Sequence, residues 1–325
     1  MSGQDQFSAI ASPWPALPLA LESAVLENEQ LRLTIYPSLG AKIGSIRTRP
    51  GDHELLQQPL LPYAPRDRTM AFEDGDASGY DECIPSVSGC ELDMPGGTLS
   101  IPDHGDFWRL AFDVTDADAA HVAMSATGFS LPLHLQKTIA LEGNRIILSY
   151  KLTNTGAGVV QYLWSAHPGF AVEPGDRIEL PSSVESVMVQ GSAGGRLGAE
   201  GARHAWPLTT TNSDDATDLS LVGSGEEPVG DKLFALAPPE GRCALRRARI
   251  GRRIEMRFDP RHAPYLGLWI CYNGWPESKT AKQFCVALEP CTAPADSLAA
   301  AMIQGLGKRL DPNASDEWQV ELRIT

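Results

Sequence analysis

Two strand-like runs end in residues that can move protons. The run VVQYLWSAH ends at His167, before Pro168, and the run KQFCVALE ends at Glu289, before Pro290. Strict alternation places Glu289 on the face of the small residues Cys285 and Ala287, which suits the floor of a concave site. Histidine and glutamate are common acid–base groups, so we predict a catalytic role for both. The alternative is a hydrogen-bonded surface histidine and a solvated glutamate, because alternation alone does not bring the two runs together.

The segment IPDHGDFWRL contains a second group of candidate residues. His104 precedes Gly105, which permits a tight turn, and Trp108 and Arg109 follow closely. Aromatic rings stack on apolar sugar faces, and arginine and histidine hydrogen-bond to hydroxyl groups. We therefore expect His104, Trp108 and Arg109 to bind a sugar. The alternative is an acidic surface turn with one buried tryptophan.

Two further acidic positions are weaker candidates for substrate binding. Asp81 and Glu82 are adjacent in GYDECIPSV, so on a strand they point to opposite faces, and we take Asp81 as the binding candidate. Asp231 opens the apolar run GDKLFAL, where a turn aspartate is the simpler explanation.

Other chemistries lack their motifs in this sequence. There is no HExxH, no GxSxG, no P-loop, no GxGxxG opening a helix and no cysteine pair at metal-binding spacing. We therefore predict no metal site, although His104, His167 and an acid remain a conceivable ligand set.

Composition restricts the partners and the compartment. The formal net charge of −14 over 325 residues disfavours nucleic acid and anionic membranes. No apolar run is long enough for a transmembrane helix, and the N-terminus does not resemble a signal peptide. Six cysteines without CxxC pairs indicate free thiols and a cytoplasmic protein. Nothing in the sequence indicates the oligomeric state.

The elements that position these residues are mainly strands. Apolar residues alternate with polar ones in short runs bounded by turn residues, as expected of half-buried antiparallel strands. The clearest runs are 31–36, 146–152, 254–258 and 318–324. One short helix is expected at 297–306, and long loops are expected over 191–231. We predict an all-β chain forming one large antiparallel β-sandwich over residues 1–325, with 1–24 as an irregular extension.

Four of these motifs together resemble the aldose 1-epimerases, the galactose mutarotases. HPGF at His167 is similar to the His-Pro-aromatic motif of that family, ALEPCT at Glu289 to its Leu-Glu-Pro motif, and DHGDFWR at His104 to its His-Gly motif. DKLF at Asp231 resembles its Asp-x-x-Phe segment, and the four occur in the family order. The sequence departs from the family at Gly169, which separates Pro168 from the aromatic residue, and at DECIP, which replaces a Gly-Arg segment.

The resemblance implies a galactose mutarotase-like supersandwich without a cofactor that interconverts the α and β anomers of an aldose. It implies that Glu289 is the general base and His167 the general acid, with His104 and Asp231 holding sugar hydroxyls. This chemistry needs an ionised glutamate and a protonated histidine, and we expect the nearby carboxylate to favour the charged imidazole.

Two other functions remain open. A hexose-6-phosphate epimerase needs a cationic cluster at its site, and the run 242–257 is the one strongly basic stretch, although solvated strands explain it more simply. A carbohydrate-binding protein of the same fold would not need both His167 and Glu289.

Overall fold

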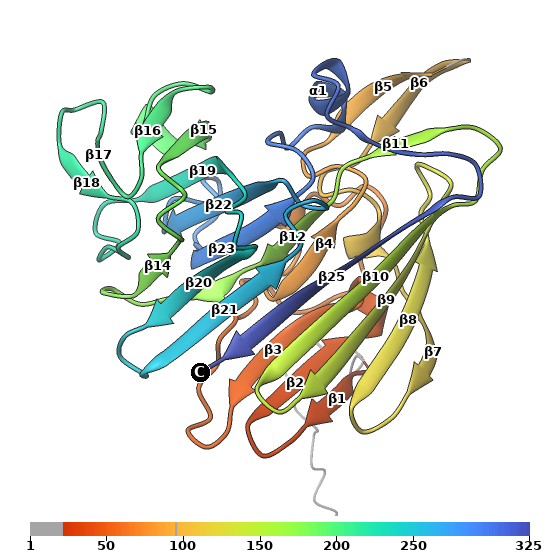
Figure 1. Cartoon of the computed structure of the whole chain (residues 1–325), viewed down its shortest axis with the longest axis horizontal. Helices are drawn as coiled ribbons and strands as arrows, with labels where there is room; N and C mark the ends of the chain where they lie inside the picture. Colours follow the sequence, from red (N-terminus) through yellow and green to blue (C-terminus); the bar gives the residue numbers. More distant parts are fainter. Residues whose placement is uncertain (1–21, 95) are drawn as a thin grey trace, which may run out of the picture.

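The computed structural model describes residues 22–94 and 96–325. The expected N-terminal extension lies mostly outside these residues, and the first strand, β1, begins at Ala24. Strands dominate, and every strand pair is antiparallel, which confirms the predicted all-β sandwich. Figure 1 shows two large sheets with small hairpins and one short helix at their edges.

The larger sheet has 11 strands and carries the candidate residues. Its order is β1 (Ala24–Glu27), β2 (Leu31–Tyr36), β3 (Lys42–Thr48), β4 (Tyr80–Cys83), β12 (Ser165–Pro168), β23 (Phe284–Cys291), β22 (Tyr265–Tyr272), β19 (Val229–Leu236), β15 (Ser186–Ser192) and β16 (Arg203–Ala205), with β13 (Phe170–Ala171) pairing with β23.

The second sheet has eight strands. Its order is β14 (Arg177–Glu179), β20 (Arg242–Arg247), β21 (Arg252–Phe258), β25 (Ser315–Ile324), β10 (Arg145–Asn154), β9 (Leu133–Glu142), β8 (His121–Thr127) and β7 (Asp113–Ala117). Three two-stranded sheets complete the described strands: β5 (Cys90–Met94) with β6 (Gly97–Ile101), β11 (Val160–Tyr162) with β24 (Lys308–Leu310), and β17 (Leu208–Thr210) with β18 (Ala216–Asp218).

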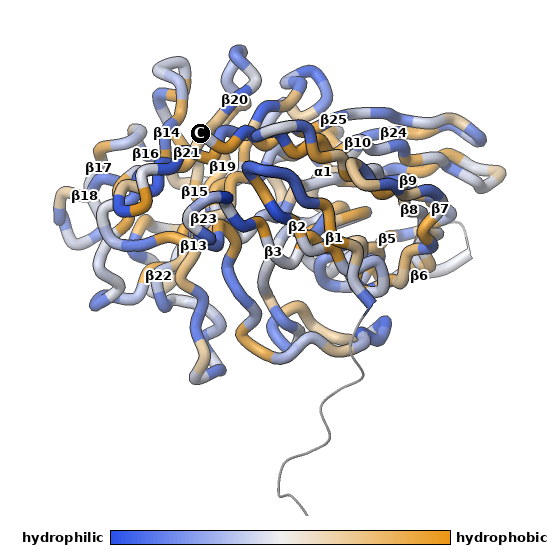
Figure 2. The backbone as a smooth tube through the Cα atoms, turned by 90° about the horizontal axis from the view of Figure 1, so that it is seen from below, coloured by the Kyte–Doolittle hydropathy of each residue, from blue (hydrophilic) through white to orange (hydrophobic). Residues whose placement is uncertain are grey.

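The core lies between the two sheets. The predicted inward faces of β2, β10, β21 and β25 are buried, and Figure 2 shows hydrophobic and hydrophilic residues alternating along much of the chain. The helix is also confirmed: α1 spans Leu298–Ile303, and the hydroxyl of Ser297 accepts a hydrogen bond from the amide of Ala300, capping it.

Two other expectations have mixed outcomes. The loop-rich stretch 191–231 contains loops but also the short strands β16, β17 and β18. The run leading to His167 is not one strand, because it breaks at Leu163 and Trp164 into β11 and β12, which belong to different sheets. Both residues at the break are buried, so the chain changes sheets inside the molecule.

All six cysteines are free thiols, as predicted, and the cytoplasmic location stays a prediction. Over the described part of the chain, no helix has the length and apolar character needed to cross a membrane.

Candidate active site

A pocket of about 210 Å³ lies on the face of the 11-stranded sheet that points away from the second sheet. The opposite face of the 11-stranded sheet packs on the second sheet: the carboxylate of Glu82, on β4, contacts Tyr150 and Lys137 there. The volume is below the range of about 300–1,000 Å³ typical for drug-sized ligands, so the pocket suits a small molecule. Its lining residues are Phe72, Val87, His104, His167, Lys232, Trp269, Trp275, Gln283, Glu289 and Asp296.

Glu289 lies in the floor of this pocket, completely buried on β23. One carboxylate oxygen, Oε2, contacts the ammonium of Lys232. The other, Oε1, has no hydrogen-bond partner in the described part of the chain, and it lies 3.9 Å from Nε2 of His167. That separation is too long for a hydrogen bond, but one hydroxyl oxygen at about 2.8 Å from each atom fits between them.

Strand register explains why His167 and Glu289 meet. Ser165 of β12 pairs directly with Cys291 of β23, and paired residues share a face of a sheet. His167 is two residues from Ser165, and Glu289 is two residues from Cys291, so both side chains project to the same side. The sequence placed Glu289 on the small-residue face of its strand, and the pairing brings His167 to the same face.

His104 reaches the pocket from a turn above the sheet. Its backbone has a φ of 58°, and that of Gly105 has a φ of 67°, so both are in the left-handed region. A Cβ at Gly105 would lie 2.0 Å from the carbonyl oxygen of Ile84, so only glycine fits there. The carboxylate of Asp103 lies 2.9 Å from Nδ1 of His104, which leaves Nε2 for a ligand.

Burial changes the protonation of the two central residues. Burial raises the pKa of Glu289, and the ammonium of Lys232 opposes this shift. Burial also holds the pKa of His167 well below its usual value, and electrostatic interactions with His104, Lys232 and Lys42 lower it further. The expectation that the nearby carboxylate favours a protonated His167 is therefore wrong: burial and these neighbouring groups favour the neutral imidazole.

Asp231 does not reach the pocket, which contradicts its predicted role. In the register of β19 with β22, Lys232 pairs with Trp269, whereas Asp231 pairs with Ile270 on the opposite face. The carboxylate of Asp231 is buried against Arg196 and the hydroxyl of Ser192. The neighbouring residue, Lys232, lines the pocket instead.

Trp108 and Arg109 are also absent from the pocket lining, contrary to prediction. The indole of Trp108 is buried between the guanidinium groups of Arg66 and Arg109, at 4.4 and 4.6 Å from the ring centroid. Trp108 Nε1 and Arg109 Nη2 both donate to the carbonyl oxygen of Asp103, at 3.1 and 2.9 Å. These residues support the turn that carries His104, and they have no surface available for a sugar.

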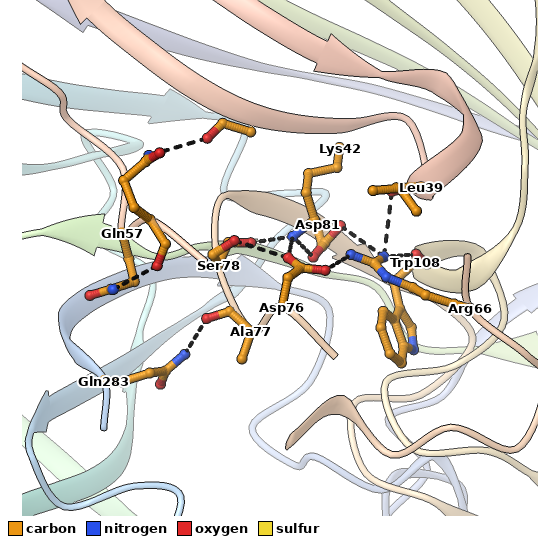
Figure 3. A network of polar contacts seen from close by, with 12 residues as sticks. Leu39, Lys42, Gln57, Arg66, Asp76, Ala77, Ser78, Asp81, Trp108 and Gln283 are labelled. Atoms are coloured by element: carbon orange, nitrogen blue, oxygen red, sulfur yellow. Dashed lines mark hydrogen bonds and ion pairs between the residues drawn. The ribbon is translucent and has the colours of Figure 1, made fainter. Parts of the chain in front are cut away.

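Asp81 is on the pocket side of the sheet, but its carboxylate is already engaged. It pairs with His167 across the strands β4 and β12, and Glu82 faces the opposite way, as predicted. The ammonium of Lys42 lies 2.6 Å from Asp81 and 2.7 Å from Asp76, in the buried ion cluster shown in Figure 3. Asp81 is therefore part of the support beneath His167 and not a substrate ligand in this structure.

The aromatic walls of the pocket come from residues that the sequence did not single out. Phe72 stacks on His104, with ring centroids 3.9 Å apart, and the ring of Trp275 lies 6.2 Å from that of Phe72 and 6.4 Å from that of Trp269. Gln283 accepts a hydrogen bond from Trp269 Nε1 and donates to the carbonyl oxygen of Ala77, which ties this wall to the loop in Figure 3. Gln283 lies six residues before Glu289, so alternation along this run places both side chains on the same face. This pattern could have identified Gln283 from the sequence.

Two residues of the pocket and one buried cysteine beside them have the composition of a metal site. Cys83, His104 and His167 each offer a ligand atom, and these atoms lie within 4.8 Å of one another. Burial raises the pKa of the Cys83 thiol well above its usual value, so metal binding at this sulfur would have to displace the thiol proton.

Comparisons with known proteins identify the fold. No protein-family model and no curated protein matches the chain. Among solved structures, the Slr1438 protein of Synechocystis sp. PCC 6803 is similar, with a TM-score of 0.69 and 15% identity over 98% of this chain and 99% of that one.

Two other solved structures carry descriptive names. A galactose mutarotase related enzyme from Lactobacillus acidophilus has a TM-score of 0.68 and 16% identity over 94% of this chain and 97% of that one. A galactose mutarotase-like protein from Lactobacillus casei has a TM-score of 0.63 and 17% identity over 94% of this chain and all of that one, 100%. At these identities the likeness shows the fold, a galactose mutarotase-like β-sandwich.

Proposed function

We propose that this protein is an aldose 1-epimerase that interconverts the α and β anomers of an unphosphorylated aldose. One observation carries the proposal: the unpartnered Oε1 of Glu289 and Nε2 of His167 face each other at 3.9 Å in a small pocket with aromatic walls. A general base and a general acid at this spacing can both reach the oxygens on an anomeric carbon.

The reaction requires two proton movements. Oε1 of Glu289 takes the proton of the anomeric hydroxyl, the bond between the anomeric carbon and the ring oxygen breaks, and His167 gives a proton to the ring oxygen. The aldehyde rotates, and the same steps in reverse close the ring on its other face. Both protons return, so nothing is consumed. Acid–base assistance of this kind accelerates reactions by about 100- to 10,000-fold.

The pKa shifts of the pair fit this proton exchange. Ring opening starts from the less populated form of the pair, in which His167 holds the proton, and it converts this carboxylate and imidazolium into a carboxyl and an imidazole. In water the ordinary pKa values favour the charged pair by about 3 kcal/mol. Burial raises the pKa of Glu289 and lowers that of His167, so the pocket offsets this preference and stabilises the uncharged pair that accompanies the open aldehyde.

Charge in the pocket favours a neutral sugar over a phosphorylated one. Lys232 is engaged by Glu289 and lies 3.7 Å from Asp296, so it is not available for a phosphate. The basic run 242–257 forms β20 and β21 of the second sheet, where Arg253 pairs with Glu179 and Glu255. These arginines therefore belong to the second sheet and do not line the pocket, and Arg247 among them is buried against Asp176.

The test is the rate of anomer exchange of glucose and galactose, measured by NMR saturation transfer. We expect the wild type to accelerate exchange and Glu289→Gln and His167→Asn each to lose most of the acceleration. Glu255→Gln, which alters a buried carboxylate of the second sheet, is the matched control and should keep it. Acceleration of glucose 6-phosphate alone would favour the phosphorylated substrate, and sugar binding without acceleration would favour a binding protein.

A further inference from the structure

Lys232 is a buried cation in the pocket without a role in the mechanism described so far. Its ammonium contacts Oε2 of Glu289 and lies 3.7 Å from Oδ1 of Asp296. Its side chain is 11% exposed, and it lies on β19, two strands away from β23. A buried lysine needs carboxylate partners, and one of these two is the proposed general base.

We infer that Lys232 is a positioning residue: its ammonium fixes Oε2 of Glu289, so that Oε1 faces His167 and the bound sugar. This inference rests on the proposed function. A carboxylate is planar, so holding one oxygen directs the other. Gly267 of β22 lies directly across from Glu289, and its missing side chain leaves the space in which Oε2 meets the ammonium.

The same contact gives Lys232 an electrostatic effect on both titrating groups. Its positive charge favours the ionised form of Glu289 and disfavours the protonated form of His167. Both effects move the pKa values of the pair downward, so Lys232 sets the pH range in which the pair holds one proton. The other titratable groups around Glu289 are His104, His167, Asp296, Cys83, Cys285 and Cys291.

The inference is tested by comparing Lys232→Met with Lys232→Arg, which keeps the charge. An opposite charge at contact distance shifts a carboxyl pKa by about 1–3 units. We therefore expect the pH–rate profile of anomer exchange to move to higher pH by about 1–3 units in Lys232→Met and to stay in place in Lys232→Arg. Asp296→Asn removes a negative charge from the same group and should move the profile to lower pH.

A readout without turnover separates this inference from the proposed function. The pKa of the His167 ring, followed by NMR in histidine-labelled protein and assigned with His167→Asn, should rise in Lys232→Met and fall in Asp296→Asn. Inactivity of the folded wild type would refute the epimerase, while the ring titration would still decide the role of Lys232. An unmoved profile and an unmoved ring pKa in folded Lys232→Met would overturn the inference. If Lys232→Met does not fold, an unchanged pKa of the His167 ring in Asp296→Asn would overturn the inference.

Discussion

Replacing Gly267 by alanine should displace the proposed general base without changing any polar side chain chemically. A Cβ at Gly267 would lie 2.9 Å from Oε2 of Glu289 and 3.2 Å from its Cβ. Ordinary contacts of this kind begin at 3.4 Å, so the carboxylate must move by about 0.5 Å. The ammonium of Lys232 holds the same oxygen, so the shift changes the direction of Oε1 as well.

The size of the effect follows from the geometry. A misplacement of about 1 Å in a catalytic group can cost a factor of about 100, so a shift of half that size should lower kcat by about 10-fold, or about 1.4 kcal/mol. Overpacking costs about 1–3 kcal/mol of folding stability, and the reduced entropy of the unfolded chain returns about 0.4–1 kcal/mol. The variant should therefore fold with a modestly lower melting temperature.

The assay is anomer exchange by NMR saturation transfer on the sugar that the wild type accelerates most, with a thermal melt on the same sample. Gly158→Ala is the control, because a Cβ there meets no atom within 4 Å. A folded Gly267→Ala protein with wild-type kcat would refute the reasoning. An equal loss of kcat in Gly158→Ala would also refute it, because either result would show that kcat does not depend on the position of the Glu289 carboxylate.

Three other predictions follow from the buried charges. Because the pKa of His167 is lowered in the folded state and is about 6.5 in the unfolded chain, stability should fall as pH drops below about 6.5, by up to about 1.4 kcal/mol per unit. Urea denaturation of His167→Asn should lack this component. Lys42→Met leaves the Asp81 carboxylate without its buried ammonium, and we expect a loss of about 3–5 kcal/mol in the free energy of unfolding. Asp231→Asn weakens the contact with Arg196, so it should cost about 1–3 kcal/mol of stability while leaving KM within about twofold of the wild type.

Local alternation predicted much of the fold because one face of most strands is buried and the other is not. In β10 and β25 the apolar residues at every second position are those in the core. The same rule placed Glu289 on the small-residue face of β23. It failed for β19, where residues on both faces are buried, so neither Asp231 nor Lys232 stands out as the one that faces a pocket. Which of the two residues faces the pocket depends on how β19 pairs with β22, and this pairing joins residues that are far apart in the sequence.

Chemical type alone also could not separate a sugar ligand from a structural support. An indole beside a guanidinium suits a sugar-binding wall, but Trp108 and Arg109 are buried and hydrogen-bond to the turn before them. The walls instead use Phe72 and Trp275, which come from loops whose position no short-range pattern encodes. Whether such a residue binds a ligand or supports the fold depends on its burial, and burial depends on the whole chain.

The protonation of His167 shows how a correct rule can give a wrong result. A carboxylate favours a protonated histidine when its charge is unopposed. Here two neighbouring carboxylates each have their own ammonium partner: Asp81 pairs with Lys42, and Glu289 pairs with Lys232. Desolvation is therefore the largest effect on the pKa of His167, and the ammonium groups of Lys232 and Lys42 lower this pKa further. The lysines are distant in sequence from the carboxylates that they neutralise, so only the folded chain reveals this balance.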